Sequence, residues 1–187
     1  MMGENKENAV KVRKNSQKVY DGLKITFDIS VKDMTDFMIF HTYSRIQGWF
    51  GLAVSVFALG YLIFNFNNME TDRKLLLLIL GLLFTVINPV VLRIKAKKQV
   101  ESNPSFKVPI TYTLAEEGIV VEQKNIQEVH PWKNVVIVKD SKRSIIVYVS
   151  RVRAFIWPKE KYADSYDQVT ETLLEKLGRD HVFIKKK

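Results

Sequence analysis

The sequence of 187 residues contains no cysteine. Without a thiol the chain cannot form disulfides, use a cysteine nucleophile, or bind zinc or an iron–sulfur cluster through thiolates. Histidine is also scarce: His41, His130 and His181 lie far apart, without the HxxxH or HxxE spacing of metal sites. The sequence therefore predicts no metal site and no cofactor.

The short patterns of common enzymes are missing as well. No GxSxG, GxxxxGKS or GxGxxG occurs, which excludes the usual nucleophile elbow and phosphate-binding loops. Glu116 and Glu117 are a candidate carboxylate pair, but adjacent residues in a strand or turn point apart, so a turn is favoured over catalysis. His130 is interpreted as a turn or strand-edge residue rather than a general base. We therefore predict no catalytic residue and no enzyme.

Two stretches of the chain lack charged residues. Residues 49–66 read WFGLAVSVFALGYLIFNF and residues 75–92 read LLLLILGLLFTVINPVVL. A helix of this length spans about 27 Å, close to the roughly 30 Å hydrocarbon core of a bilayer. The alternative is a buried helix of a soluble bundle, but such a helix normally keeps a polar stripe. The sequence predicts two transmembrane helices, and Pro89 predicts a kink in the last turn of the second.

The connection between the two stretches, residues 67–74, is short, so the helices are predicted to be antiparallel neighbours. Positive flanks stay in the cytoplasm, so the distribution of Lys and Arg gives the orientation. Residues 1–48 contain eight and residues 93–110 contain five, whereas the connection contains Arg73 and Lys74. We predict a multi-pass protein of the plasma membrane with both termini cytoplasmic and residues 67–74 outside.

Each predicted transmembrane helix carries a stripe of small or polar residues at i, i+4, i+7 spacing. Such stripes permit close approach of helix backbones in lipid. Packing of the hairpin on itself is the favoured interpretation, and a homodimer or partner surface is the alternative. A transport pathway is not favoured, because it would need facing ionisable groups. The stripes are Gly51, Ser55 and Ala58 on the first helix and Gly81, Thr85 and Asn88 on the second.

The residues before the first apolar stretch divide into two parts. Residues 1–20 are polar and aperiodic, which predicts a disordered cytoplasmic tail. Residues 21–48 are predicted to contain a strand at Leu23–Val31, where apolar and polar side chains alternate, and a juxtamembrane helix that Asp33 can cap. A lone strand leaves its backbone groups unpaired, so this strand is expected to join a sheet formed after residue 107.

Residues 105–180 are predicted to form a cytoplasmic β domain. Runs rich in β-branched and aromatic residues predict strands at 108–114, 119–121, 132–138, 145–149 and 152–157. A helix is predicted over 164–177, with Ser165 and Gln168 at capping-box spacing and Gly178 at its end. The predicted fold class is α+β: an antiparallel transmembrane hairpin inserted in a small antiparallel β meander, which is covered only by the C-terminal helix.

Basic residues gather in two places. The first set follows the second apolar stretch, where topology is its default role and attraction of anionic headgroups, about 1 kcal/mol per cation, is the other. The second set surrounds the last two predicted strands and is interpreted either as a phosphate-binding patch or as a solvated face balanced by carboxylates. The first set is Arg93, Lys95, Lys97 and Lys98, and the second is Lys142, Arg143, Arg151, Arg153 and Lys159.

The net charge of +9 is compatible with nucleic-acid binding. Positive charge is densest directly beside the predicted bilayer, however, so lipid is the favoured partner and no nucleic-acid partner is predicted.

Three segments of the C-terminal half resemble recurring segments of the YcxB-like bacterial membrane proteins. These segments are Gly118–Val121, Pro131–Val135 and Arg153–Lys159, which contain the Trp-x-x-Val and Ala-Phe-x-x-Pro-Lys steps. The resemblance covers residues 23–178 and implies that the β part is a small pleckstrin-homology-like domain. It implies no activity and no catalytic residue.

Two functions from different classes are therefore expected. The first is a membrane-anchored, non-catalytic recognition module that binds a protein or anionic lipid headgroups at the cytoplasmic face. The second is an accessory or immunity-type subunit that restrains a larger membrane protein or toxin through its helical hairpin. The sequence leaves the protein partner and the oligomeric state open.

Overall fold

The computed structural model describes residues 18–184, so nearly all of the expected N-terminal tail lies outside the described residues. These residues divide into two compact units. One, the helical unit, comprises Ser30–Asn103. The other, the β unit, combines the residues up to Ile29 with those from Pro104 onward. Each unit is described by itself below.

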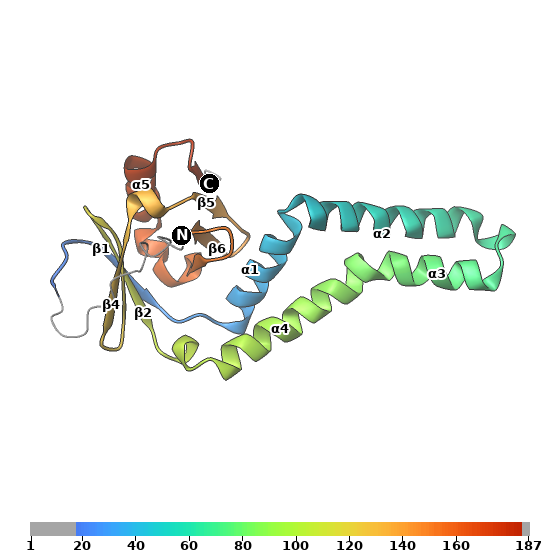
Figure 1. The fold of residues 1–187 in the computed structure, drawn as a ribbon, viewed down its shortest axis with the longest axis horizontal. Coiled ribbons are helices and arrows are strands. Elements are labelled where there is room, and N and C mark those ends of the chain that lie inside the picture. Colours follow the sequence, from blue (N-terminus) through green and yellow to red (C-terminus); the bar gives the residue numbers. More distant parts are fainter. Residues whose placement is uncertain (1–17, 185–187) are drawn as a thin grey trace, which may run out of the picture. The chain divides into compact units, whose positions relative to one another are not determined.

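The first sheet of the β unit is antiparallel, with the strand order β1-β2-β3-β4. Its strands are β1 (Gly22–Phe27), β2 (Ile110–Ala115), β3 (Gly118–Gln123) and β4 (Ile126–Pro131). The expected pairing of the N-terminal strand with the later sheet is confirmed, since Phe27 pairs with Ile110 and Gly22 with Ala115. The whole helical unit is therefore inserted between two neighbouring strands of one sheet (Figure 1).

The second sheet has the order β7-β6-β5-β8. It consists of β5 (Ile137–Asp140), β6 (Ser144–Tyr148), β7 (Ala154–Pro158) and the two-residue β8 (Val182–Phe183). The first three strands are antiparallel, and β8 pairs parallel to β5. The expectation of one meander covered only by a helix is therefore wrong within residues 18–184, because eight strands form two sheets there.

The two sheets pack through aromatic side chains. The ring of Tyr112 on β2 lies 5.4 Å from Phe155 and 5.5 Å from Trp157, both on β7, and 5.4 Å from Phe27 on β1. Trp157 is fully buried. The C-terminal helix α5 (Tyr166–Leu177) adds fully buried Val169 and Leu173 to the same unit. The apolar face of the first sheet is thus covered by the second sheet.

Several predicted boundaries in the β unit are wrong for physical reasons. β1 ends at Phe27 because Ser30 begins a helix. β4 was not predicted because its sequence, IQEVHP, has neither a run of β-branched residues nor an apolar–polar alternation. The strand predicted at 132–138 instead begins as a 3-10 turn at Trp132–Asn134. The capping box predicted at Ser165 is absent, since that side chain makes no cap hydrogen bond. Gly178 does end α5, with a φ of 75° that favours glycine.

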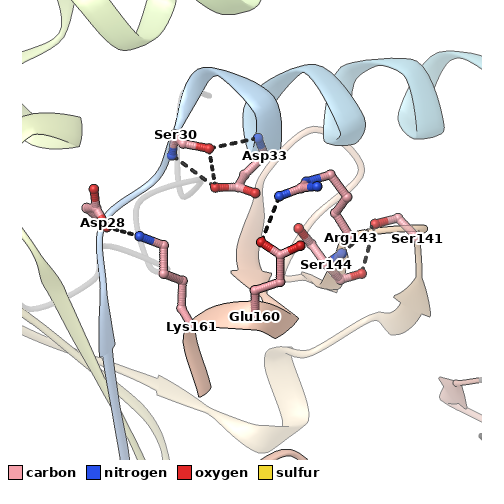
Figure 2. A network of polar contacts seen from close by, with 8 residues as sticks. All are labelled: Asp28, Ser30, Asp33, Ser141, Arg143, Ser144, Glu160 and Lys161. Carbon is pink, nitrogen blue, oxygen red and sulfur yellow. Dashed lines mark hydrogen bonds and ion pairs between the residues drawn. The ribbon is translucent and has the colours of Figure 1, made fainter. Parts of the chain in front are cut away.

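The helical unit begins with α1 (Val31–Tyr43), whose N-cap is Ser30 rather than Asp33. The Ser30 hydroxyl accepts a hydrogen bond from Asp33 N at 3.2 Å, and the Asp33 carboxylate accepts from Ser30 N at 3.1 Å (Figure 2). This reciprocal arrangement is a capping box. A break at Ser44–Arg45 separates α1 from α2 (Ile46–Asn65), which a 3-10 turn at Phe66–Asn68 extends.

The return helix runs from Thr71 to Ser102. It consists of α3 (Thr71–Leu82), a π-helical turn (Leu83–Ile87) and α4 (Asn88–Ser102). Figure 1 shows α2 and α3 side by side and a change of direction at the π turn, beyond which α4 lies along α1. Pro89 was expected to kink the last turn of a helix ending at residue 92; the helix instead continues to Ser102, and the irregular turn ends at Ile87, two residues before Pro89.

Within the described residues, two helices are long and apolar enough to cross a membrane, Ile46–Asn68 and Thr71–Ser102. The expected pair of long apolar helices is therefore confirmed.

Candidate functional site

The hairpin interface of the helical unit contains small residues where the two apolar helices meet. On α2, Gly51, Ser55 and Ala58 are buried, and on α3 Gly81 is buried. A Cβ at Gly51 would lie 2.5 Å from the ring of Phe84, and a Cβ at Gly81 would overlap the Leu59 side chain. The space beside each glycine is therefore filled by a side chain of the facing helix in the hairpin.

The π turn interrupts the backbone hydrogen-bond ladder, and Ser55 fills the gap. In an α-helix Phe84 N would donate to Leu80 O. Here Phe84 N donates to the Ser55 hydroxyl at 3.3 Å, and that hydroxyl donates to Leu80 O at 2.8 Å. A side chain of α2 therefore replaces one backbone hydrogen bond of the neighbouring helix.

A second interruption follows one turn later. Asn88 N donates to Leu83 O, so it is not available to Phe84 O. The i+5 partner of Phe84 O would be residue 89, but proline has no N–H. Instead the Tyr43 hydroxyl on α1 donates to Phe84 O at 2.6 Å and accepts from the Asn88 side-chain amide at 3.2 Å. Side chains from α1 and α2 thus form hydrogen bonds with the backbone groups of Phe84 that both interruptions leave without a helical partner.

Thr85, the remaining member of the predicted stripes, has a local role. Its hydroxyl donates to Gly81 O at 2.6 Å, within its own helix. The six stripe residues are therefore not equivalent: two are close-contact glycines, Ser55 and Asn88 bond across helices, Ala58 is buried, and Thr85 bonds back along its own chain.

The first basic set lies on α4. All four cations, Arg93, Lys95, Lys97 and Lys98, are exposed, and Lys97 lies 3.9 Å from Glu101. Between them Ala96 is 0% exposed. Because α4 packs against α1, the small side chain of Ala96 marks the face of α4 that meets α1. The four cations occupy the remaining faces.

The second basic set is divided in the β unit. Lys159 forms an ion pair with the largely buried Asp140 and donates to Ser141 O at 2.7 Å, so it fastens the β5–β6 turn. Arg143 lies 3.0 Å from Glu160 (Figure 2). Lys142, Arg151 and Arg153 are exposed. The predicted five-residue patch is therefore not one continuous set of solvated cations.

Arg151 and Arg153 flank an ordered turn between β6 and β7. The Ser150 hydroxyl accepts from Val152 N at 3.3 Å and from Arg153 N at 2.9 Å. Both Val149 N and Ser150 N donate to Arg153 O. The turn presents Val152, which is 79% exposed, between the two arginines.

His130 lies on β4 among charged and aromatic groups. Its ring packs edge-on against Phe155 at 4.9 Å, and its Nε2 lies 3.4 Å from the Glu128 carboxylate. Burial lowers the pKa of His130 below its ordinary 6.5; the Glu128 carboxylate opposes this shift and Arg153 adds to it. Within residues 18–184 no group of three His, Asp or Glu side chains is arranged to hold a metal ion.

The segments that resemble the YcxB-like family contain residues that hold turns of the β unit in place or are buried in it. The Trp132 indole donates to Ala115 O at 2.9 Å, which ties the turn after β4 to the end of β2. Val135 of the same step is buried. Lys159 of the Pro-Lys step holds the β5–β6 turn, as described above. The recurring residues therefore maintain the fold of the β unit.

Comparison with protein families confirms this resemblance over part of the chain. The family model described as YcxB-like protein matches residues 114–173, from the end of β2 into α5. No curated protein and no solved structure matches the chain.

Proposed function

We propose, from the YcxB-like segment and the two long apolar helices, that this chain is a membrane-anchored, non-catalytic recognition module. The helical unit spans the bilayer as a hairpin. The β unit, a pleckstrin-homology-like domain, binds a protein partner at the cytoplasmic face, and the basic residues of α4 bind anionic lipid headgroups.

The observation that carries the proposal is the exposure of large apolar side chains on the helical unit. Such a continuous surface would aggregate in water, whereas lipid covers it. Aromatic residues lie toward both ends of α2, as in helices that end at membrane interfaces. The exposed large apolar side chains of α2 include Trp49 at 67%, Phe57 at 75% and Phe64 at 89% exposure. The exposed apolar side chains of the return helix include Leu75, Leu76, Ile79, Val86 and Val90.

Charge supports the orientation. The cations of α4 follow the apolar part of the return helix directly, and positive flanks remain cytoplasmic. Both connections to the β unit then lie on the cytoplasmic side.

The pleckstrin-homology-like assignment rests on two packed sheets, antiparallel except for the short β8, and on the helix α5 that follows β7. The β unit would be held at the membrane by both of its connections to the hairpin. Anionic headgroups are the favoured ligand of α4, because each cation near the surface contributes about 1 kcal/mol.

The first test is whether the full chain behaves as an integral membrane protein. We expect it to stay in the membrane fraction after alkaline carbonate extraction and to require detergent for solubility. Monodisperse full-length protein in detergent-free buffer would contradict the proposal. The full chain is needed because a fragment starting at residue 105 would lack β1, so that β2 would keep its pairing with β3 but expose its other edge.

The second test addresses the lipid. In detergent, native mass spectrometry should detect retained phosphatidylglycerol in preference to phosphatidylcholine, and replacing the four α4 cations by Gln should abolish the preference. The matched control replaces four exposed lysines of the β unit, Lys24, Lys107, Lys124 and Lys133, by Gln. Equal loss in both variants would mean that only net charge matters.

An accessory subunit that restrains a larger membrane protein is the second candidate. One observation favours it: a Cβ at Gly60 on α2 would meet nothing within 4 Å, so another helix can approach closely there. Gly60→Leu would then release a co-purifying membrane partner while the hairpin stays intact. Retention of the partner by this variant would exclude Gly60 as the contact point.

A further inference from the structure

The π turn changes the direction in which every later side chain of the return helix points. A π turn uses one residue more than an α turn, and one residue corresponds to about 100° of rotation. The position held by Ala96 would be held by Lys95 if the turn were α-helical. A lysine would then face α1 at a place where the present side chain is fully buried.

Pro89 accounts for the position of the π turn. A proline ring clashes with the carbonyl four residues earlier, which here is Thr85 O, and Thr85 lies within the π turn Leu83–Ile87. The π turn leaves Phe84 N and Phe84 O without their α-helical partners, whereas Leu80 O accepts from Leu83 N as well as from Ser55. In an apolar medium each such unsatisfied backbone group costs several kcal/mol.

The donors that stabilise this turn come from other helices. Ser55 stands between Phe84 N and Leu80 O, and Tyr43 donates to Phe84 O. Neither residue contacts the basic segment in these bonds. Both act on it only through the hydrogen-bond register of the helix that carries it.

We propose that the π turn, which Tyr43 also stabilises, aims the basic segment of α4 outward, and that Ser55 and Pro89 are positioning residues for anionic-lipid binding by Arg93, Lys95, Lys97 and Lys98. This inference rests on the proposed function, since it assigns the side chains that orient its lipid-binding cations. The ligand class is the anionic phospholipid headgroup.

The absence of cysteine allows a direct reading of the register, because each single cysteine is then the only thiol. Lys95→Cys and Ala96→Cys are introduced separately into the full chain, and their reaction with a membrane-impermeant maleimide is measured in vesicles that expose the cytoplasmic face. We expect residue 95 to react and residue 96 to be protected. In the Pro89→Ala, Ser55→Ala background we expect the reverse pattern, together with loss of the phosphatidylglycerol preference.

Two further variants make the result decisive if the double variant does not insert. One alanine inserted after Leu92 shifts the basic segment by one residue while Ser55 and Pro89 remain, so it should give the reversed pattern and the lost lipid preference. Thr85→Val removes a hydroxyl from the same turn that bonds only within its own helix. It should leave both readouts unchanged.

The outcomes separate this inference from the proposed function. An unchanged labelling pattern in the double variant would overturn the role of Ser55 and Pro89. A reversed pattern with a full phosphatidylglycerol preference would overturn the link between register and lipid binding. Absence of any preference in the wild-type chain would instead refute the lipid part of the proposed function, whereas its labelling pattern would still report the register.

Discussion

The helical unit and the β unit differ in the sizes of the side chains that they mostly bury. In the β unit the largest fully buried residues are apolar, among them Trp157, Ile145 and Leu173. On α2 of the helical unit the buried residues are glycine, serine and alanine together with Leu62, whereas Trp49 and Phe64 are exposed. A sheet sandwich in water must hide its large apolar side chains, but helices in lipid gain more from close backbone contact. The contrast indicates that the two units are built for different solvents.

The largest expected effect comes from removing a core side chain of the β unit. Trp157→Ala should lower the free energy of unfolding by about 3–5 kcal/mol, because it leaves a large cavity between the sheets. Denaturant unfolding of the full chain in detergent, followed by circular dichroism, measures the loss.

The matched variant is Trp49→Ala on α2, where the indole is exposed. It should change the free energy of unfolding by less than about 0.5 kcal/mol, as for other exposed sites. Similar losses of unfolding free energy in the two variants would contradict the idea that large aromatic side chains are buried in the β unit but exposed on the helical unit.

A second prediction concerns a buried charge. Lys159→Met should cost about 2–3 kcal/mol of unfolding free energy, because it leaves the Asp140 carboxylate without its ammonium partner. Lys142→Met, on the same turn but exposed, is the control and should be nearly neutral. If both substitutions were neutral, the assignment of Lys159 to the fold rather than to a phosphate site would fail.

A third prediction concerns the hairpin. Gly81→Leu should lower stability by about 1–3 kcal/mol, because the new side chain must displace Leu59 from a close helix contact. Gly60→Leu adds the same side chain at a position where a Cβ would meet no atom within 4 Å, so it should not change the stability. Thermal unfolding of the two variants in detergent distinguishes them, and a neutral Gly81→Leu would mean that the helices do not need this approach.

Sequence periodicity predicted most of the fold. Alternation identified β1 and β2, and a run of β-branched residues identified β6, which is buried along its whole length. It missed β4, where Gln127, Glu128 and His130 carry polar groups on both faces. The predicted single meander failed because strand order depends on contacts between residues far apart in the chain, which local pattern does not report.

Some features of the candidate sites could be predicted from the local sequence and others could not. The glycine and serine stripes and the α4 cations follow from spacing and composition. The π turn does not, because its extra residue depends on Ser55 and Tyr43 reaching from other helices. Pro89 was the only local signal of irregularity. The pairing of Lys159 with Asp140 likewise depends on how β5, β6 and β7 are aligned.

The smallest expected effect belongs to an ion pair on the surface of the β unit. Lys161 donates to the Asp28 carboxylate at 2.9 Å (Figure 2), and this hydrogen bond lowers the pKa of Asp28 below its ordinary 3.8. A carboxyl with a lowered pKa binds fewer protons when folded, so the pair adds stability above pH 3.8 that is lost as the pH falls through the folded-state pKa.

Lys161→Ala should therefore cost less than about 1 kcal/mol at neutral pH, because both side chains are partly exposed, and nothing at pH values below the folded-state pKa. High salt should reduce the difference further, since mobile ions screen exposed pairs. Unfolding of the wild type and the variant at several pH values and salt concentrations measures both trends. A cost that persists unchanged in acid would assign the effect to packing of the Lys161 alkyl chain instead of to charge.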